Sequence, residues 1–185
     1  MENKTPFMTE IPEQEPQRQQ YFMAHAKEQL HILEENLGRP LTCCINTFGC
    51  QMNARDSEKL LGILETIGYQ AVETEDADFV LYNTCTVREN ANLRVYGRLG
   101  QLGARKKKHP HMMIALCGCM MQEKEVVEKI KKTYRFVDLI FGTHNIFKLA
   151  ELVSLCLEER LEELEARGRE DKKPKHKMVV DVWKD

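Results

Sequence analysis

Phe79-Val80-Leu81-Tyr82-Asn83-Thr84-Cys85 begins with four consecutive apolar residues. These four lack the polar alternation of a strand that has one face in water, so they predict a strand buried on both faces. Similar short apolar runs occur at residues 41–47, 112–116 and 137–141, and residues 70–72 predict a short edge strand. The sequence therefore predicts several buried strands distributed along the chain.

Amphipathic segments separate these strands. Apolar residues recur there at helical spacing, which predicts helices over residues 53–67, 88–108, 122–134 and 145–166. Strands without polar alternation that are separated by helices indicate a parallel sheet covered on both faces. We therefore predict an α/β fold with an open, mainly parallel sheet, of the Rossmann or flavodoxin type.

The ends of the chain differ from this pattern. Residues 1–20 are rich in Gln, Glu and Pro and are expected to form a disordered tail. Residues 21–38 predict an N-terminal helix, which Gly38 ends. Residues 39–182 are expected to form the α/β domain, and residues 177–182 begin one more strand after a charged linker.

Composition restricts the class of protein. The 185 residues carry 27 Lys and Arg against 29 Asp and Glu, a net charge of −2, which argues against a globally basic nucleic-acid binder. No apolar run approaches the roughly 20 residues of a membrane span, and no secretory signal is evident. We expect a cytoplasmic protein without a membrane partner. Its seven cysteines, an odd number, favour metal or thiol chemistry over disulfide scaffolding.

Three of the cysteines occupy equivalent positions. Cys50, Cys85 and Cys119 each follow a predicted strand and precede a predicted helix. Such loops share the carboxyl edge of an open parallel sheet, so the three thiols are expected to meet in space. The helix N-terminus after each cysteine favours the thiolate.

A structural zinc ion normally takes four protein ligands, one more than these three cysteines supply. A 4Fe-4S cluster usually has four cysteine ligands as well. On three cysteines, it would keep one iron open for an external ligand. The pattern therefore favours a reactive cluster over a structural metal ion.

The other cysteines favour simpler interpretations. A single cysteine is most often a small core residue, and we expect Cys43, Cys44 and Cys156 to pack in the interior. Cys117 is ambiguous, because Cys117-Gly118-Cys119 also has the form of a redox pair. The basic residues Arg105 to Lys108 end a predicted helix, where a solvated turn is a simpler explanation than an RNA contact.

Three ordered motifs resemble those of a known family. They are Thr47-Phe48-Gly49-Cys50-Gln51-Met52-Asn53 followed by Asp56-Ser57-Glu58, then Asn83-Thr84-Cys85-Thr86-Val87-Arg88-Glu89, and Gly118-Cys119-Met120-Met121-Gln122. Together they resemble the N-terminal domain of the radical-SAM methylthiotransferases, over roughly residues 41–182. Gln51 and Met52 resemble the subgroup that acts on tRNA and converts N6-isopentenyladenosine next to the anticodon to its 2-methylthio derivative.

The resemblance implies a cofactor and a partner. Cys50, Cys85 and Cys119 would hold an auxiliary 4Fe-4S cluster involved in delivering sulfur. Gln51, Asn53, Thr84 and Arg88 belong to the same motifs and are expected to surround it. In the family, a second cluster on a Cys-x-x-x-Cys-x-x-Cys motif cleaves S-adenosylmethionine in a downstream barrel, and a small RNA-binding domain usually follows.

The sequence departs from the family in one respect. The 185 residues contain no Cys-x-x-x-Cys-x-x-Cys motif. We therefore expect a truncated fragment that lacks the barrel and the RNA-binding domain and is inactive alone. Its expected partners are tRNA and the barrel of its own full-length chain.

Two other functions remain compatible with the sequence. One is a zinc- or RNA-binding module without redox chemistry, which would use the basic residues Arg105 to Lys108. The other is a thiol-disulfide protein that uses Cys117 and Cys119.

Overall fold

The computed structural model describes residues 10–49, 51–85, 89–167, 169 and 175–182, and for residues 51, 52 and 89–92 it describes the backbone alone. The elements follow one another in this order: α1 (Gln17–Leu37), β1 (Thr42–Thr47), α2 (Gln51–Ile67), β2 (Gln70–Ala71), β3 (Phe79–Thr84), α3 (Glu89–Lys108), β4 (Met113–Gly118), η2 (Cys119–Gln122), α4 (Lys124–Thr133), β5 (Leu139–Phe141), η3 (Thr143–Lys148), α5 (Leu149–Glu165) and β6 (Val179–Asp181).

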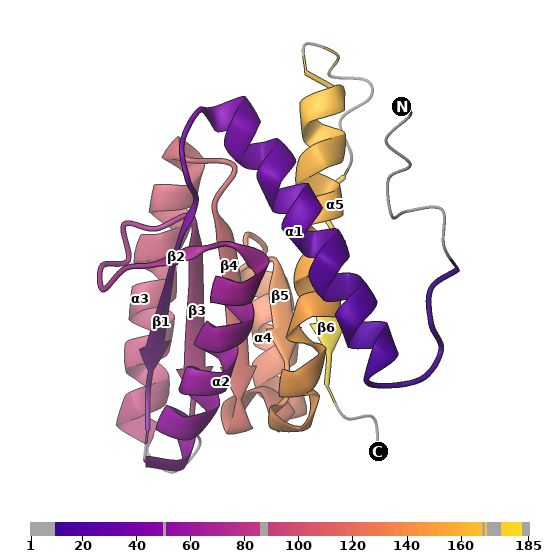
Figure 1. Ribbon diagram of the computed structural model, residues 1–185. Helices are drawn as coiled ribbons and strands as arrows, with labels where there is room; N and C mark the ends of the chain where they lie inside the picture. Colours follow the sequence, from indigo (N-terminus) through magenta and orange to yellow (C-terminus); the bar gives the residue numbers. More distant parts are fainter. Residues whose placement is uncertain (1–9, 50, 86–88, 168, 170–174, 183–185) are drawn as a thin grey trace, which may run out of the picture.

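The strands form one open sheet in the order β2-β1-β3-β4-β5-β6, and every neighbouring pair is parallel (Figure 1). The predicted parallel α/β sheet is thus confirmed. The central strands β3 and β4 are buried at every position, as their continuous apolar sequences require. Because chain order reverses between β1 and β3, this point is the topological switch of the sheet, where such folds bind ligands.

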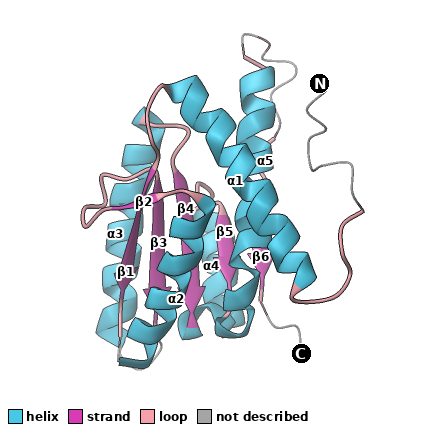
Figure 2. Cartoon of the chain, viewed as in Figure 1, coloured by secondary structure: helices cyan, strands magenta, loops and turns pink. Residues whose placement is uncertain are grey.

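Helices cover both faces of the sheet (Figure 2). Alternate strand residues such as Phe79 and Leu81 pack in one core with α1, α2 and α5. Their neighbours Val80 and Tyr82 pack in a second core with α3 and α4. Full burial of each large apolar side chain contributes about 1.5–3 kcal/mol, so the strands are fixed from both sides.

The N-terminal helix is part of this packing. Helix α1 begins at Gln17, so it includes the last four residues of the stretch 1–20 that was expected to be a tail. It ends at Gly38, which has φ 73° and donates its N–H to Glu34 O at 2.8 Å. Leu30 is buried, and Gln29 exchanges hydrogen bonds with Ser154 of α5. The two helices lie side by side in Figure 1.

Two aspartates organise the amino edge of the sheet. Asp78, just before β3, accepts the Thr42 N–H at 2.9 Å, and Asp138, just before β5, accepts the Ile114 N–H at 2.8 Å. Each carboxylate thus satisfies a backbone N–H at the start of the neighbouring strand. Strand β5 begins at Leu139 instead of the predicted residue 137, because the Val137 N–H bonds back to Tyr134 O in the turn before the strand.

Candidate metal centre

The three strands that precede the predicted cysteine ligands end level with one another. Thr47 of β1 pairs with Asn83 of β3, and Thr84 of β3 pairs with Gly118 of β4. Cys85 and Cys119 follow β3 and β4 directly. Cys50 lies outside the described residues. The sheet therefore brings the starts of the three cysteine loops to one edge, as predicted.

Gly49 lies against Cys85. A β-carbon added at Gly49 would be 2.5 Å from Cys85 Cβ and 3.3 Å from Cys85 Sγ. The φ angle of Gly49, 148°, is also one that other residues rarely adopt. Only glycine allows the loop before Cys50 to approach Cys85 this closely.

Gly118 makes the corresponding approach from β4. A β-carbon there would lie 2.1 Å from Thr84 O, and the φ angle of 103° again requires glycine. Thr84 Oγ1 donates to Cys117 O at 2.6 Å and ties the two strand ends together. The backbone at Gly49 and the backbone at Gly118 therefore both contact the segment Thr84–Cys85, and each immediately precedes a cysteine.

The thiols at this edge suit a soft metal centre. Cys85 is 6% exposed, Cys119 is exposed, and neither forms a disulfide. Thiolates are the usual protein ligands of iron-sulfur clusters. The donor chemistry of the described residues therefore fits the group that the motifs imply.

A network of neutral polar side chains supports these loops from the α2 side. Asn53 Nδ2 donates to Thr84 O at 3.0 Å, which gives both residues, predicted to surround the cluster, a place at this edge. Asn83 Nδ2 donates to Asn53 O at 2.8 Å and to Ser57 Oγ at 3.0 Å, and Ser57 Oγ lies 2.7 Å from Thr47 Oγ1. The structure places Gln51 at the start of α2, whereas Arg88 lies outside the described residues.

Sequence reasoning assigned no role to Asn83 or Ser57. Asn83 is fully buried, and it is a polar residue at the end of an otherwise apolar strand. A buried amide needs hydrogen-bond partners for its donors and acceptor. An Asn at this buried position therefore predicts a polar network around it. Which residues would supply those partners depends on how α2 packs, and periodicity does not show that.

A comparison of the sequence with known protein families gives a match that includes this edge of the sheet. The uncharacterized protein family UPF0004 matches residues 42–142, which is more than half of the chain and includes β1, β3 and β4. The chain belongs to this family. The matched stretch of UPF0004 contains all three predicted cysteine ligands.

Several curated relatives share a name. The protein of Lachnoclostridium phytofermentans is 63% identical over 163 residues, 88% of this chain and 32% of the relative. Those of Acetivibrio thermocellus and Clostridioides difficile are 50% and 44% identical over 174 residues, 94% of this chain and 33% of each relative. All three are named tRNA-2-methylthio-N(6)-dimethylallyladenosine synthase, which confirms the resemblance to methylthiotransferases. The chain spans about a third of the length of these relatives.

The remaining cysteines are interior residues. Cys43, Cys44, Cys117 and Cys156 are at most 3% exposed. Burial raises the pKa of Cys43 to about 12 and raises the pKa of Cys117 well above its ordinary value. A thiol with a raised pKa is a poor nucleophile, so Cys117 is unsuited to a redox pair with Cys119.

The basic residues at the end of α3 lie at the opposite edge of the sheet, and two of them have structural partners. Lys106 was expected to face water, and this is wrong. Its Nζ donates to both oxygens of Asp138 at 2.9 and 2.8 Å and to Phe136 O, and its side chain is 12% exposed. Arg105 pairs with Asp76. An RNA surface built on residues 105–108 would therefore compete with bonds that hold the fold.

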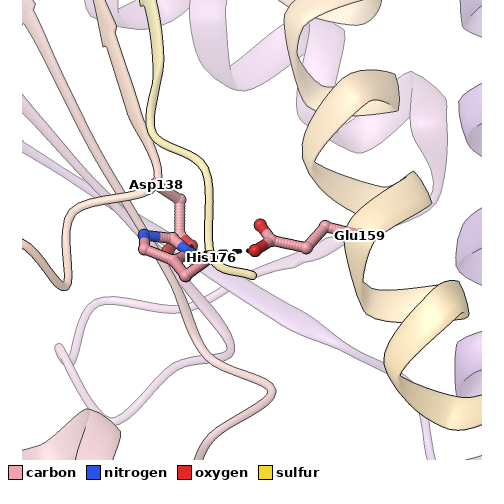
Figure 3. A group of neighbouring side chains, drawn as sticks. All are labelled: Asp138, Glu159 and His176. Atoms are coloured by element: carbon pink, nitrogen blue, oxygen red, sulfur yellow. Dashed lines mark hydrogen bonds and ion pairs between the residues drawn. The ribbon is translucent and has the colours of Figure 1, made fainter. Parts of the chain in front are cut away.

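One further group has the composition of a metal site. Figure 3 shows His176 beside Glu159 and Asp138, with His176 Nδ1 3.0 Å from Glu159 Oε1 and 3.8 Å from Asp138 Oδ1. Lys106 and Arg160 both bind Asp138, the latter at 2.7 Å. These two cations already compensate the carboxylates and would repel a metal ion. We interpret the group as a charge network that attaches the segment 175–182 to the sheet.

Proposed function

We propose that this chain is the part of a tRNA methylthiotransferase that holds an auxiliary 4Fe-4S cluster on Cys50, Cys85 and Cys119. The observation that carries the proposal is the close approach of Gly49 and Gly118 to Thr84 and Cys85. It explains why glycine precedes two of the three cysteines. A single structural cysteine would have no need of two such contacts from separate strands.

The chain's own residues would bind, orient and shield the cofactor. Cys85 is nearly closed to water, whereas Cys119 is exposed. Asn53, Asn83 and Thr84 fix the loops by neutral hydrogen bonds and add no charge to the site. When bound, such a cluster supplies an iron without a cysteine ligand, at which a sulfur species can bind. Because Cys119 is exposed, a substrate could approach the site from its side.

The substrate in this proposal is tRNA that carries N6-isopentenyladenosine next to the anticodon. Support comes from the names of the relatives, which state 2-methylthio and N(6)-dimethylallyladenosine. S-adenosylmethionine and a second cluster would belong to the radical-SAM barrel of a longer enzyme, and tRNA would bind mainly outside this chain. We further propose a cytoplasmic location. Among the residues that the structure describes, no helix is long and apolar enough to cross a membrane.

Anaerobic reconstitution with iron and sulfide tests the cluster. We expect a brown protein with about four iron and four sulfide per chain, and loss of both in the Cys85→Ala and Cys119→Ala variants. Cys156→Ala is the matched control for Cys85→Ala, because Cys156 is also buried but lies in α5. Stoichiometric zinc without visible absorbance, or colour that survives loss of Cys85, would overturn the proposal.

A further inference from the structure

One carboxylate oxygen on the loop between β2 and β3 collects three donors from three elements. Glu75 Oε1 accepts Asn46 Nδ2 of β1 at 2.7 Å, Tyr82 OH of β3 at 2.6 Å and Arg98 Nη2 of α3 at 2.5 Å. Burial, and then the neighbouring Glu75, raise the pKa of Tyr82, so its hydroxyl keeps the proton that it donates. Glu75 thus joins two strands and a helix at one atom.

The guanidinium that Glu75 holds lies over two aromatic rings. Arg98 Cζ is 5.2 Å from the centre of the Phe48 ring and 5.5 Å from that of Tyr82. The two rings themselves pack edge to face with their centres 5.0 Å apart. Cation–π attraction at these distances presses Phe48 onto β3. We call Glu75, Arg98, Tyr82 and Phe48 the Glu75 clamp.

The clamp acts on the chain just before the candidate metal centre. Phe48 N–H donates to Asn83 O at 2.7 Å, which extends the pairing of β1 with β3 beyond the end of β1. Phe48 precedes Gly49, the residue whose backbone lies against Cys85. Asn53 and Asn83 support the same loop from the α2 side, and the clamp supports it from the α3 side.

We propose that Glu75 and Arg98 are positioning residues, which hold Phe48 and Gly49 so that the first cysteine can join the other two at the cluster. This inference rests on the proposed function, because it assigns the clamp to the same site. Neither residue is a proposed ligand of the cluster. They act through the Phe48 ring.

Two variants separate positioning from general stability. Glu75→Gln keeps the side-chain shape but removes the charge that holds Arg98, and Arg98→Met keeps an apolar cover on Phe48 but removes the cation. Glu73→Gln is the matched control, because Glu73 is exposed on the same loop. Amide exchange is followed residue by residue in the metal-free chain, and iron loss to a chelator is followed in the reconstituted chain.

We expect exchange at the Phe48 amide to become about ten-fold faster in both clamp variants. Exchange at the Met113 amide, which bonds to Asp78 O at the other edge, should not change. Iron should leave about ten-fold faster, the usual size of an outer-shell effect on metal affinity. The control should match the wild-type chain in all three measurements.

Equal acceleration at Phe48 and Met113 would overturn the inference, because the clamp would then stabilise the fold as a whole. Unchanged iron retention in both variants would overturn it as well. A wild-type chain that takes up no iron would instead refute the proposed function. The two failures are therefore distinguishable.

Discussion

Asn83 links β3 to α2 at the carboxyl edge of the sheet by neutral hydrogen bonds. Its amide donates to Asn53 O and Ser57 Oγ, and its Oδ1 accepts from Asn53 Nδ2 at 3.3 Å. An amide offers donors and acceptors together, so one buried residue links β3 to α2 at little cost. The proposed thiolate ligands nearby are thus supported by neutral hydrogen bonds on the α2 side.

Gly118 gives a residue-scale prediction. We expect Gly118→Ala to lower the free energy of unfolding by about 1–3 kcal/mol or more, because the new methyl group would strike Thr84 O at a φ angle that strains alanine. Denaturant unfolding followed by circular dichroism measures the loss.

The matched control is Gly97→Ala. Gly97 lies in α3, and a β-carbon there has open space around it. Alanine should therefore stabilise the helix by about 0.5–1 kcal/mol. If Gly118→Ala and Gly97→Ala changed the free energy of unfolding by equally small amounts, the close approach of β3 and β4 at Gly118 would not contribute to stability.

The position of Cys85 and Cys119 at one edge of the sheet could be predicted from residues alone, but the side chains that support this edge could not. Strand ends locate Cys85 and Cys119 because the rule depends only on periodicity and parallel pairing. The partners of Glu75 and Lys106 lie far away in sequence, as the Lys106 bond to Asp138 illustrates. A charged residue in a basic run gives no sign of such a partner, so Lys106 was wrongly expected to face water.

Helix α1 could be predicted from the sequence, but the helix on which it packs could not. Its apolar spacing predicted the helix and its Gly38 end, and the structure confirms both. The packing of α1 on α5 could not be predicted, because the spacing of its apolar residues does not show which apolar surface they contact. The 174-residue matches include α1, so the helix belongs to the stretch that those relatives share.

Substitutions on two faces of α1 test whether it belongs to the fold. Leu30 is 1% exposed, and we expect Leu30→Ala to cost about 2–5 kcal/mol in unfolding free energy. Ile32 on the same helix is 45% exposed, and Ile32→Ala should change it by less than about 0.5 kcal/mol. Similar small effects of both changes in thermal or urea unfolding would contradict the packing of α1 on α5.

The bonds of Asp78 at the amino edge of the sheet predict that the stability of the fold depends on pH. Burial alone would raise the pKa of Asp78, but hydrogen bonds outweigh it. The donors are Arg39, His111 and the Thr42 N–H, and they hold the pKa of Asp78 well below its usual range. Because the pKa of Asp78 is lower in the folded chain than in the unfolded chain, ionised Asp78 stabilises the fold at pH values above the unfolded pKa of about 4. This stabilisation is lost as the pH falls further.

We therefore expect the unfolding free energy of the wild-type chain to fall as pH drops below about 4. Asp78→Asn should be less stable than wild type at pH 7 and should lose part of this acid dependence. Urea titrations between pH 3 and pH 7 measure both slopes. Parallel slopes in the two proteins would show that Asp78 does not contribute.

The amino and carboxyl edges of the sheet differ in the residues that hold them together. Aspartates paired with cations hold the amino edge, as the Asp78–Arg39 and Asp138–Arg160 pairs show. Neutral amides, close glycine contacts and thiols lie at the carboxyl edge, where the Glu75–Arg98 ion pair supports Phe48. Ligands of open parallel sheets bind at the carboxyl edge, beside the strand-order reversal between β1 and β3.

The global fold could be predicted because continuous apolar strands between amphipathic helices admit few arrangements. Strand order and the sharing of one face by α1, α2 and α5 required the structure. The four-residue segment η2 depends on local contacts more than on periodicity, whereas β6 lies within the strand predicted at residues 177–182. The net charge of −2 fits the proposal that tRNA binds mainly outside this chain.

The most direct test of the account is thiol alkylation read by mass spectrometry, under anaerobic conditions, before and after loading with iron and sulfide. Cys119 is exposed, so it should react readily in the metal-free chain, whereas the buried Cys117 should not. We predict that loading protects Cys119 by about ten-fold or more, as expected for a thiolate bound to iron. Equal alkylation of Cys119 in the metal-free and the iron-loaded chain would contradict the assignment of this edge as a cluster site.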